Sequence, residues 1–158
     1  MSKKVVPIIT TILIMIIIFV LSGQNSGESS DLSRGFTSKI IDIIAKEMDG
    51  AQKTDLLLHI HSFIRKCAHF FIYALLGVSS LIMMKNIFTV KPYFKAWTYA
   101  IILCFIYAAS DEFHQLFIDG RSGEIADVLL DTAGSLFGSG IFSALRQLFN
   151  LKRRNDDD

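Results

Sequence analysis

Hydrophobic residues in this chain are concentrated in four long stretches instead of alternating with polar residues. The stretches are Val5–Leu21, Cys67–Met84, Ala96–Ala109 and Ile125–Leu145. Amphipathic helices of water-soluble proteins carry apolar side chains on one face, whereas these stretches are apolar around the whole helix. A helix needs about 20 mostly apolar residues to cross the hydrocarbon core of a bilayer. The pattern therefore predicts membrane-spanning helices.

We predict an all-α fold, an integral membrane bundle of four transmembrane helices in a single domain over residues 1–158. The predicted helices cover residues 5–22, 66–84, 94–114 and 124–146. Ala96–Ala109 is too short to span the membrane alone, so we expect that helix to take in residues on both sides. Val5–Leu21 also has the positive flank of a secretory signal, but it is long for one and no Ala-x-Ala motif follows it.

The long connection between the first two helices, residues 23–65, is predicted to be extracytoplasmic. Within it, apolar residues recur at helical spacing from Phe36 to Met48, with charged residues between them. That pattern is typical of an amphipathic helix, which can lie on the outer membrane surface or pack over the bundle as a lid. A further short helix over Leu56–Phe63 is predicted to lead into the second span.

The composition excludes several other classes of protein. Hydrophobic residues make up 51% of the chain and charged residues 20%, which excludes a disordered, a collagen-like or a disulfide-rich secreted chain. Cys67 and Cys104 lie inside apolar stretches without metal-type spacing, so we interpret them as packing residues. The net charge of +1 and the lack of a recognisable motif give no reason to expect a nucleic-acid partner.

The distribution of charge along the chain predicts its orientation in the membrane. With four spans, one side of the membrane carries nine basic residues, which are Lys3, Lys4, Lys85, Lys91, Lys95, Arg146, Lys152, Arg153 and Arg154. That side has three acidic residues, whereas the opposite side has seven basic and twelve acidic residues. Because cytoplasmic segments are enriched in lysine and arginine, both termini are predicted to be cytoplasmic.

This topology brings the polar residues of every span to the same outer interface. They are Ser22, Gln24, Arg65, Lys66, His69, Asp111, Glu112, His114, Gln115, Arg121, Glu124, Asp127 and Asp131. Asp131 lies roughly 10 Å deeper than Glu124 along its helix. A carboxylate at that depth has to face the bundle interior or a wet cavity, because exposure to lipid costs too much free energy.

Helical spacing groups these residues into faces. Residues three or four positions apart share a face, as in the sets Asp111–His114–Gln115, Arg65–His69 and Asp127–Asp131. Gly134 and Gly138 continue the last set, and small residues there let a neighbouring helix approach closely.

Several of these residues form motifs that are specific in combination. The motifs are Ser22-Gly23-Gln24, Arg65-Lys66-Cys67-Ala68-His69-Phe70, and Asp111-Glu112-Phe113-His114-Gln115 followed by Arg121, Asp127, Asp131 and Gly134. With them the chain resembles the VanZ-like family of bacterial integral membrane proteins, from Leu21 to about Gly138. The resemblance implies a multi-pass protein of the bacterial cell membrane, in a family with members associated with low-level resistance to the lipoglycopeptide teicoplanin. It implies no settled biochemical activity.

We expect the outer cluster to act as a hydrolase or transferase on a lipid-phosphate headgroup, so that membrane lipids are the expected partners. The candidate catalytic residues are His69, Asp111, Glu112, His114 and Asp127, because imidazole titrates near neutral pH and carboxylates orient such bases. The candidate substrate-binding residues are Gln24, Arg65, Lys66, Gln115 and Arg121, because guanidinium binds phosphate in a bidentate manner. The carboxylates are also suited to a divalent cation, a cofactor that the sequence leaves open.

Two alternatives stay open at this stage. The polar residues could form a network that only neutralises itself and pins the helices together. The same pocket could also belong to a non-enzymatic protein that binds a lipid or an antibiotic without cleaving a bond. A transporter is a weaker interpretation, because the predicted pocket opens at one interface only. The oligomeric state is not predicted.

Overall fold

The computed structural model describes residues 5–23, 49–87, 92–118, 121 and 123–156. Within these ranges the chain forms four helices and no strand, as predicted. The helices are α1 (Val5–Ser22), α3 (Gly50–Asn86), α4 (Tyr93–Gln115) and α5 (Ile125–Asp156). Each contains a segment that is long and apolar enough to cross a membrane. The chain is therefore an all-α, multi-pass membrane protein.

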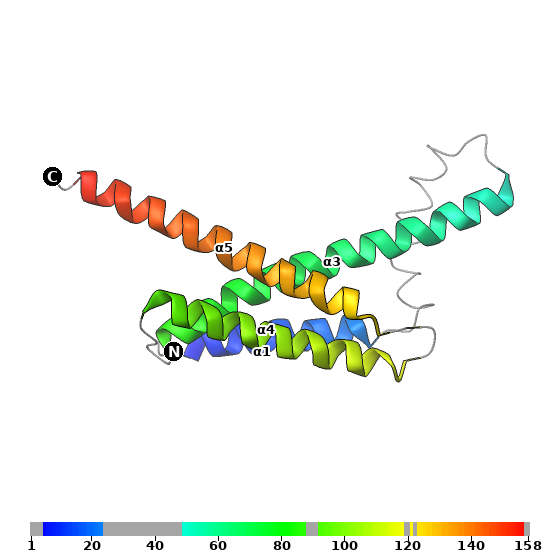
Figure 1. Cartoon of the computed structure of the whole chain (residues 1–158), viewed down its shortest axis with the longest axis horizontal. Coiled ribbons are helices and arrows are strands. Elements are labelled where there is room, and N and C mark those ends of the chain that lie inside the picture. The colour runs from blue at the N-terminus through cyan, green and yellow to red at the C-terminus, as the bar shows by residue number, and fades with distance from the viewer. Residues whose placement is uncertain (1–4, 24–48, 88–91, 119–120, 122, 157–158) are drawn as a thin grey trace.

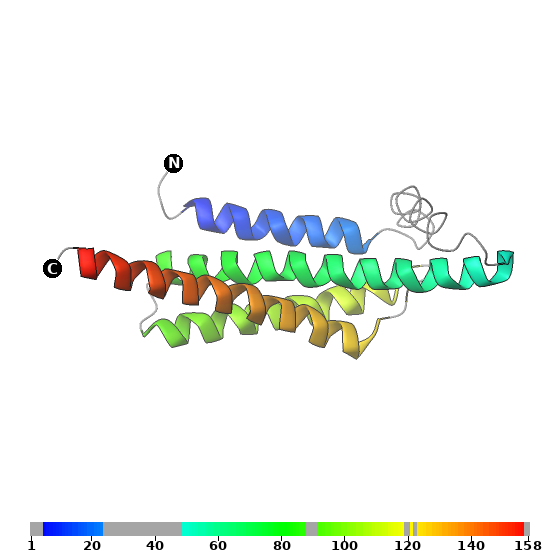
Figure 2. The ribbon, with the colours of Figure 1, turned by 90° about the horizontal axis from the view of Figure 1, so that it is seen from above.

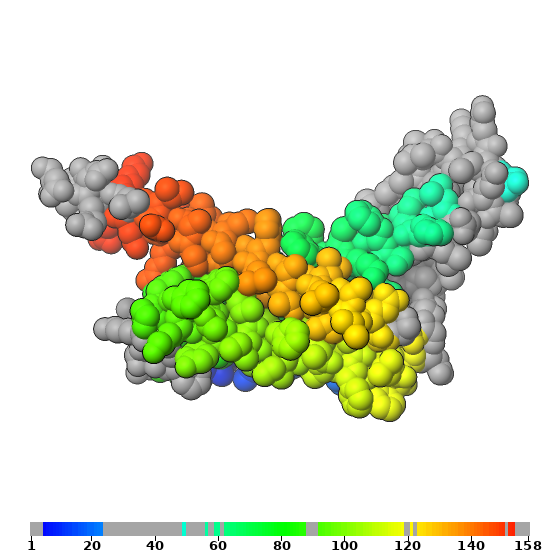
Figure 3. All heavy atoms as spheres, viewed as in Figure 1, coloured from blue at the N-terminus to red at the C-terminus, as the bar shows by residue number. Residues whose placement is uncertain are grey.

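Successive helices run in opposite directions, so α1 begins and α5 ends at the same end of the bundle (Figure 1). α3 lies in the middle, with α1 on one side and α4 and α5 on the other (Figure 2). The first turns of α3 and the last turns of α5 project away from the common body as two arms (Figure 3). Each of the other three helices contacts α3. The central helix α3 therefore sets the positions of α1, α4 and α5.

Two of the helices are longer than the sequence predicts. α3 begins at Gly50, so the prediction that residues 23–65 form one connection is wrong for residues 50–65. No proline or further glycine interrupts the chain before Lys66, and the short helix predicted over Leu56–Phe63 is part of α3. α5 likewise continues past residue 146 to Asp156. The amphipathic helix predicted for Phe36–Met48 lies outside the described residues.

Small residues on α3, α4 and α5 allow these helices to approach closely. On α5, a Cβ atom added to Gly138 would lie 2.7 Å from the carbonyl carbon of Ala74 on α3. On α4, a buried stripe of Ala96, Ala100, Cys104 and Ala108 faces the bundle. Helices in lipid gain no hydrophobic free energy from association, so close packing of this kind carries much of their stability. The predicted role of the α5 glycines is confirmed.

Hydroxyl groups supply further contacts between helices. The hydroxyl of Thr11 on α1 is 2.8 Å from that of Ser79 on α3, and both side chains are buried. The indole of Trp97 on α4 donates a hydrogen bond of 3.0 Å to Ser139 on α5. The cysteines are free, and Cys104 is buried, in agreement with the prediction that they are packing residues.

Candidate functional site

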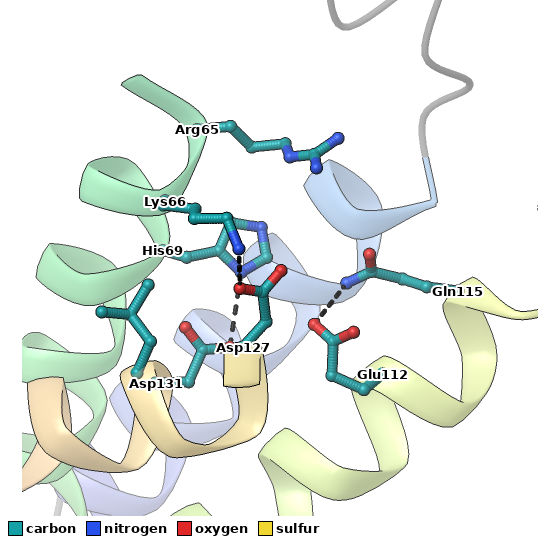
Figure 4. Close-up of a pocket in the computed structure, with 8 residues that line it drawn as sticks. Arg65, Lys66, His69, Glu112, Gln115, Asp127 and Asp131 are labelled. Carbon is teal, nitrogen blue, oxygen red and sulfur yellow. Dashed lines mark hydrogen bonds and ion pairs between the residues drawn. The ribbon is translucent and has the colours of Figure 1, made fainter. Parts of the chain in front are cut away.

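The candidate site lies at the end of the bundle where α4 ends and α5 begins (Figure 1). A cleft opens there, with about 230 Å³ of non-protein volume, part of it open to solvent. Its walls are formed by α3, α4 and α5 (Figure 4). The lining residues are Arg65, Lys66, His69, Glu112, Gln115, Asp127, Leu130 and Asp131. Seven of these eight are among the polar residues that the topology assigned to one interface.

The inward direction of the acidic residues follows from the packing of their helices. The buried stripe of small residues on α4 continues one turn beyond Ala108 into Asp111 and Gln115, so the same face that packs in the bundle carries these polar groups. On α5, Asp131 is on the face that continues into Ser135 and Ser139, and all three are fully buried. The chain thus places polar side chains on the two faces that cannot turn to lipid.

Polar side chains of α3 contact acidic residues in and just before α5 at two depths. Near the mouth of the cleft, the Lys66 ammonium pairs with Asp127 and lies 3.5 Å from a carboxylate oxygen of Glu124. Deeper, Nδ1 of His69 lies 3.4 Å from Oδ2 of Asp131. The Lys66 side chain is 35% exposed, whereas that of Asp131 is fully buried. The cleft therefore has a wet, cationic mouth and a dry, anionic floor.

Glu112 joins the end of α4 to the start of α5. One of its oxygens accepts a 3.1 Å hydrogen bond from the Gln115 amide, and the other accepts a 3.0 Å bond from the backbone N–H of Glu124. Gly123 packs so tightly here that an added Cβ atom would lie 2.5 Å from the backbone oxygen of Glu112. With a bond at each oxygen, Glu112 holds the connection between the helices in place.

Asp111 lies below this connection, close to α1. The hydroxyl of Ser22, the last residue of α1, donates a 2.7 Å hydrogen bond to Oδ2 of Asp111, and the Gln115 amide is 3.5 Å from the same oxygen. Both Ser22 and Asp111 are buried. This bond ties α1 to α4 beneath the cleft.

Three buried polar atoms on the floor have no hydrogen-bond partner among the residues that the structure describes. They are the hydroxyl of Tyr73 and Oδ1 of both Asp111 and Asp131. Tyr73 is fully buried, with its ring stacked along that of His69 at 6.4 Å between centroids. Tyr73 was not among the sequence candidates, although its position one helical turn after His69 was a signal for it.

Arg121, in the connection between α4 and α5, lies above Gln115. It donates to the Gln115 side-chain oxygen at 3.5 Å and to the backbone oxygen of Leu21 at 3.4 Å. Burial lowers the pKa of the Arg121 guanidinium from its ordinary value, and repulsion from Arg65 lowers it further, while Asp111 and Glu112 oppose the shift. Two charged guanidinium groups, one on a lining residue and one bonded to a lining residue, are therefore found at this end of the bundle, since arginine keeps its charge in proteins.

The structure separates one candidate histidine from the cleft. The His114 ring stacks on Phe19 of α1, with 4.6 Å between ring centroids, and does not line the cleft. Gln24, a predicted substrate-binding residue, lies outside the described residues. The structure thus brings together Arg65, Lys66, His69, Glu112, Gln115 and Asp127 around one cleft. Asp111 and Arg121 lie below and above it.

Comparison with known proteins gives one match. The family model described as VanZ/LLP1 matches residues 7–147, which is most of the chain. No curated protein and no solved structure matches the chain. The match overlaps all four membrane-spanning segments and includes every residue that lines the cleft.

Proposed function

Because the chain belongs to the VanZ/LLP1 family, and because its polar cleft opens at one end of a membrane bundle, we propose that it acts on the phosphate-bearing headgroup of a membrane lipid. The reaction is hydrolysis or transfer of the headgroup at the outer face of the bacterial cell membrane. The excess of basic residues near the two termini supports this orientation, since it places the cleft at the outer interface.

The observation that carries the proposal is Arg65 in the lining of the cleft, together with Arg121, which is hydrogen-bonded to the lining residue Gln115. Arg65 extends its guanidinium over the cleft from α3 (Figure 4), and Arg121 approaches from the connection after α4. Both carry positive charge, and Arg121 is half-buried. A dianionic phosphate between them accepts charge-assisted hydrogen bonds from both.

His69 is the reactive group that this geometry favours. Its Nδ1 faces Asp131, so its Nε2 is on the opposite edge of the ring. The Asp131 carboxylate orients the imidazole and stabilises its protonated form, which is the arrangement that a general acid or base needs. Water or an acceptor alcohol attacks phosphorus and forms a new P–O bond while the P–O bond to the leaving alcohol breaks. Nε2 of His69 takes the proton of the nucleophile and gives it to the oxygen of the leaving alcohol. His114 is the second candidate for this role, from a position beside Phe19.

The link to teicoplanin belongs to the same proposal. Teicoplanin acts at the outer surface of the membrane and carries a lipid chain, so a change in the headgroups of the outer leaflet changes the surface that it meets. We expect cells that produce the protein to tolerate more teicoplanin than cells that produce a His69→Ala variant at equal membrane levels. Equal tolerance would separate the drug phenotype from the cleft.

The enzymatic proposal is tested with purified protein in maltoside micelles that contain glycerophospholipids or isoprenoid phosphates. We expect His69→Ala to lower kcat by about 10²–10⁴-fold, as for the loss of a general acid or base. We expect Arg65→Gln to weaken substrate binding by roughly 10–100-fold, which corresponds to the loss of a hydrogen bond to a charged group. The same assay on His114→Ala decides between the two histidines.

The matched control for Arg65→Gln is Lys85→Gln, which removes a positive charge from the opposite end of the same helix. Lys85 lies over the ring of Tyr93, 4.2 Å from its centroid, far along α3 from the cleft. This variant should behave like the wild type. Headgroup binding without any product would instead indicate a non-enzymatic lipid-binding protein. Binding that is equally weak in both charge variants would overturn the assignment of the cleft.

A further inference from the structure

Three metal-ligating side chains from three different helices meet on the floor of the cleft. One nitrogen of His69 on α3 and one carboxylate oxygen each from Asp111 on α4 and Asp131 on α5 all lie within 4.8 Å of one another. Asp111 is 3% exposed and Asp131 is fully buried. The two carboxylates are therefore buried at the floor of the cleft, whereas the His69 side chain is 16% exposed and also lines the cleft.

Buried polar atoms without a hydrogen-bond partner are found on the same side chains and next to them. Oδ1 of Asp111, Oδ1 of Asp131 and the hydroxyl of Tyr73 lack hydrogen-bond partners in the described part of the chain. Tyr73 is fully buried, and its ring is stacked along that of His69 with 6.4 Å between centroids, so it lies next to one of the three metal-ligating side chains. Buried polar atoms are normally paired, because an unpaired one costs about 1–3 kcal/mol. Two of these atoms belong to the carboxylates that meet His69, and Tyr73 is stacked along the same histidine, so one shared ligand would be close to all three side chains.

The spacing fits a cation better than a direct hydrogen bond. Nδ1 of His69 and Oδ2 of Asp131 are 3.4 Å apart, which is long for a charge-assisted hydrogen bond. Two ligands bound at 2.0–2.2 Å to a tetrahedral Zn²⁺ ion are themselves about 3.4 Å apart. The two side chains are thus already at the separation that a shared ion requires.

Charge points to a divalent ion. Asp111 and Asp131 are two carboxylates within membrane-spanning segments, where a charge without compensation is expensive. A neutral imidazole leaves both negative charges in place, and a divalent cation balances them. An imidazole nitrogen beside carboxylate oxygens is a donor set for Zn²⁺ and its transition-metal neighbours, whereas Mg²⁺ and Ca²⁺ prefer oxygen alone.

We propose that His69, Asp111 and Asp131 bind one divalent transition-metal cation beneath the headgroup cleft, with the hydroxyl of Tyr73 beside it. The hydrogen bond from Ser22 to Asp111 then orients a ligand, as outer-shell contacts do in metal sites. The site shares His69 and Asp131 with the headgroup proposal and adds Asp111, and binding of the ion does not depend on whether the cleft cleaves a lipid.

The test is a metal titration of the purified protein in maltoside, a detergent without phosphate, after treatment with a chelator. Zn²⁺ should bind the wild type with a stoichiometry of one per chain, and Co²⁺ in its place should give the visible absorption of a low-symmetry complex with nitrogen and oxygen ligands. The Co²⁺ spectrum uses the wild-type protein alone, so it decides the question even if a variant fails to fold. A wild type that binds neither ion overturns the proposal and leaves a water-filled or protonated network.

The variants locate the site. Asp111→Asn and Asp131→Asn should each weaken Zn²⁺ binding at least about tenfold, since even the loss of an outer-shell partner has that effect. Tyr73→Phe should change affinity less and shift the Co²⁺ spectrum. Asp127→Asn is the matched control, because Asp127 lines the same cleft but pairs with Lys66, so its affinity for Zn²⁺ should equal that of the wild type. Equal weakening in all three aspartate variants would place the ion elsewhere.

The titration contains no lipid phosphate, so it separates the two proposals. Zn²⁺ binding without lipid turnover would overturn the enzymatic function and leave the metal site in place. Lipid turnover that persists after complete removal of metal, in a protein that binds no metal on titration, would overturn the metal site and leave the enzymatic function in place.

Discussion

The close approach of α3 and α5 predicts the outcome of replacing Gly138 with alanine. The new Cβ atom would lie 2.7 Å from the carbonyl carbon of Ala74 and 2.8 Å from its Cα atom, and it would contact the carbonyl oxygen as well. All of these are backbone atoms, so no side-chain rotation can make room. The two helices have to move apart along the interface that positions His69 against Asp131.

Gly140 provides the matched control on the same helix. An added Cβ atom there meets nothing within 4 Å. Alanine has a higher helix propensity than glycine by about 0.5–1 kcal/mol, and both substitutions gain this amount. The difference between the two variants therefore isolates the cost of overpacking, which is about 1–3 kcal/mol.

The assay is thermal unfolding of the purified variants in one detergent. Unfolding is monitored by the fraction of the native gel-filtration peak that remains after heating to each temperature. For a chain of this size 1 kcal/mol shifts Tm by roughly 2–4 °C, so Gly138→Ala should melt roughly 2–12 °C below Gly140→Ala. Gly140→Ala itself should be as stable as the wild type or slightly more stable. Equal melting temperatures for the two variants would refute the close backbone contact between α3 and α5.

Two further predictions concern orientation and the contact of α1 with α3. In a Cys67→Ala background, a membrane-impermeant maleimide added to intact cells should label Gly120→Cys and not Asn155→Cys, because both termini are expected inside; the reverse pattern would contradict this orientation. Thr11→Val and Ser79→Ala remove the two sides of a buried 2.8 Å hydrogen bond, and a double-mutant cycle of unfolding should give a coupling of about 0.6 kcal/mol. Zero coupling would mean that the contact adds nothing to stability.

The number and type of the elements could be predicted from the sequence, because spans must be long and apolar whatever surrounds them. The boundaries could not be predicted equally well. A helix that leaves the membrane continues as long as its residues favour helical structure. Hydropathy does not reveal this part of the helix, because its residues are not apolar. The early start of α3 at Gly50 and the late end of α5 at Asp156 are both extensions of this kind.

The gathering of polar residues at one end was also predictable, since topology alone assigns each residue a depth. The pairing of those residues depends on how each helix rotates about its axis, and this is decided by packing. The stripe of small residues on α4 turns Asp111 and Gln115 inward, whereas His114, on the same turn, meets Phe19 of α1 instead. The hydroxyl of Tyr73 on the floor is a second result of rotation that composition does not show.

The central claim, that the cleft acts on lipid headgroups, is tested most directly by the lipid composition of living membranes. Membrane lipids are extracted from cells that produce the wild type and from cells that produce His69→Ala at equal membrane levels, and their phosphate headgroups are quantified. The account predicts a changed headgroup population with the wild type that disappears with His69→Ala. Identical headgroup populations in the two membranes and in cells without the protein would contradict it.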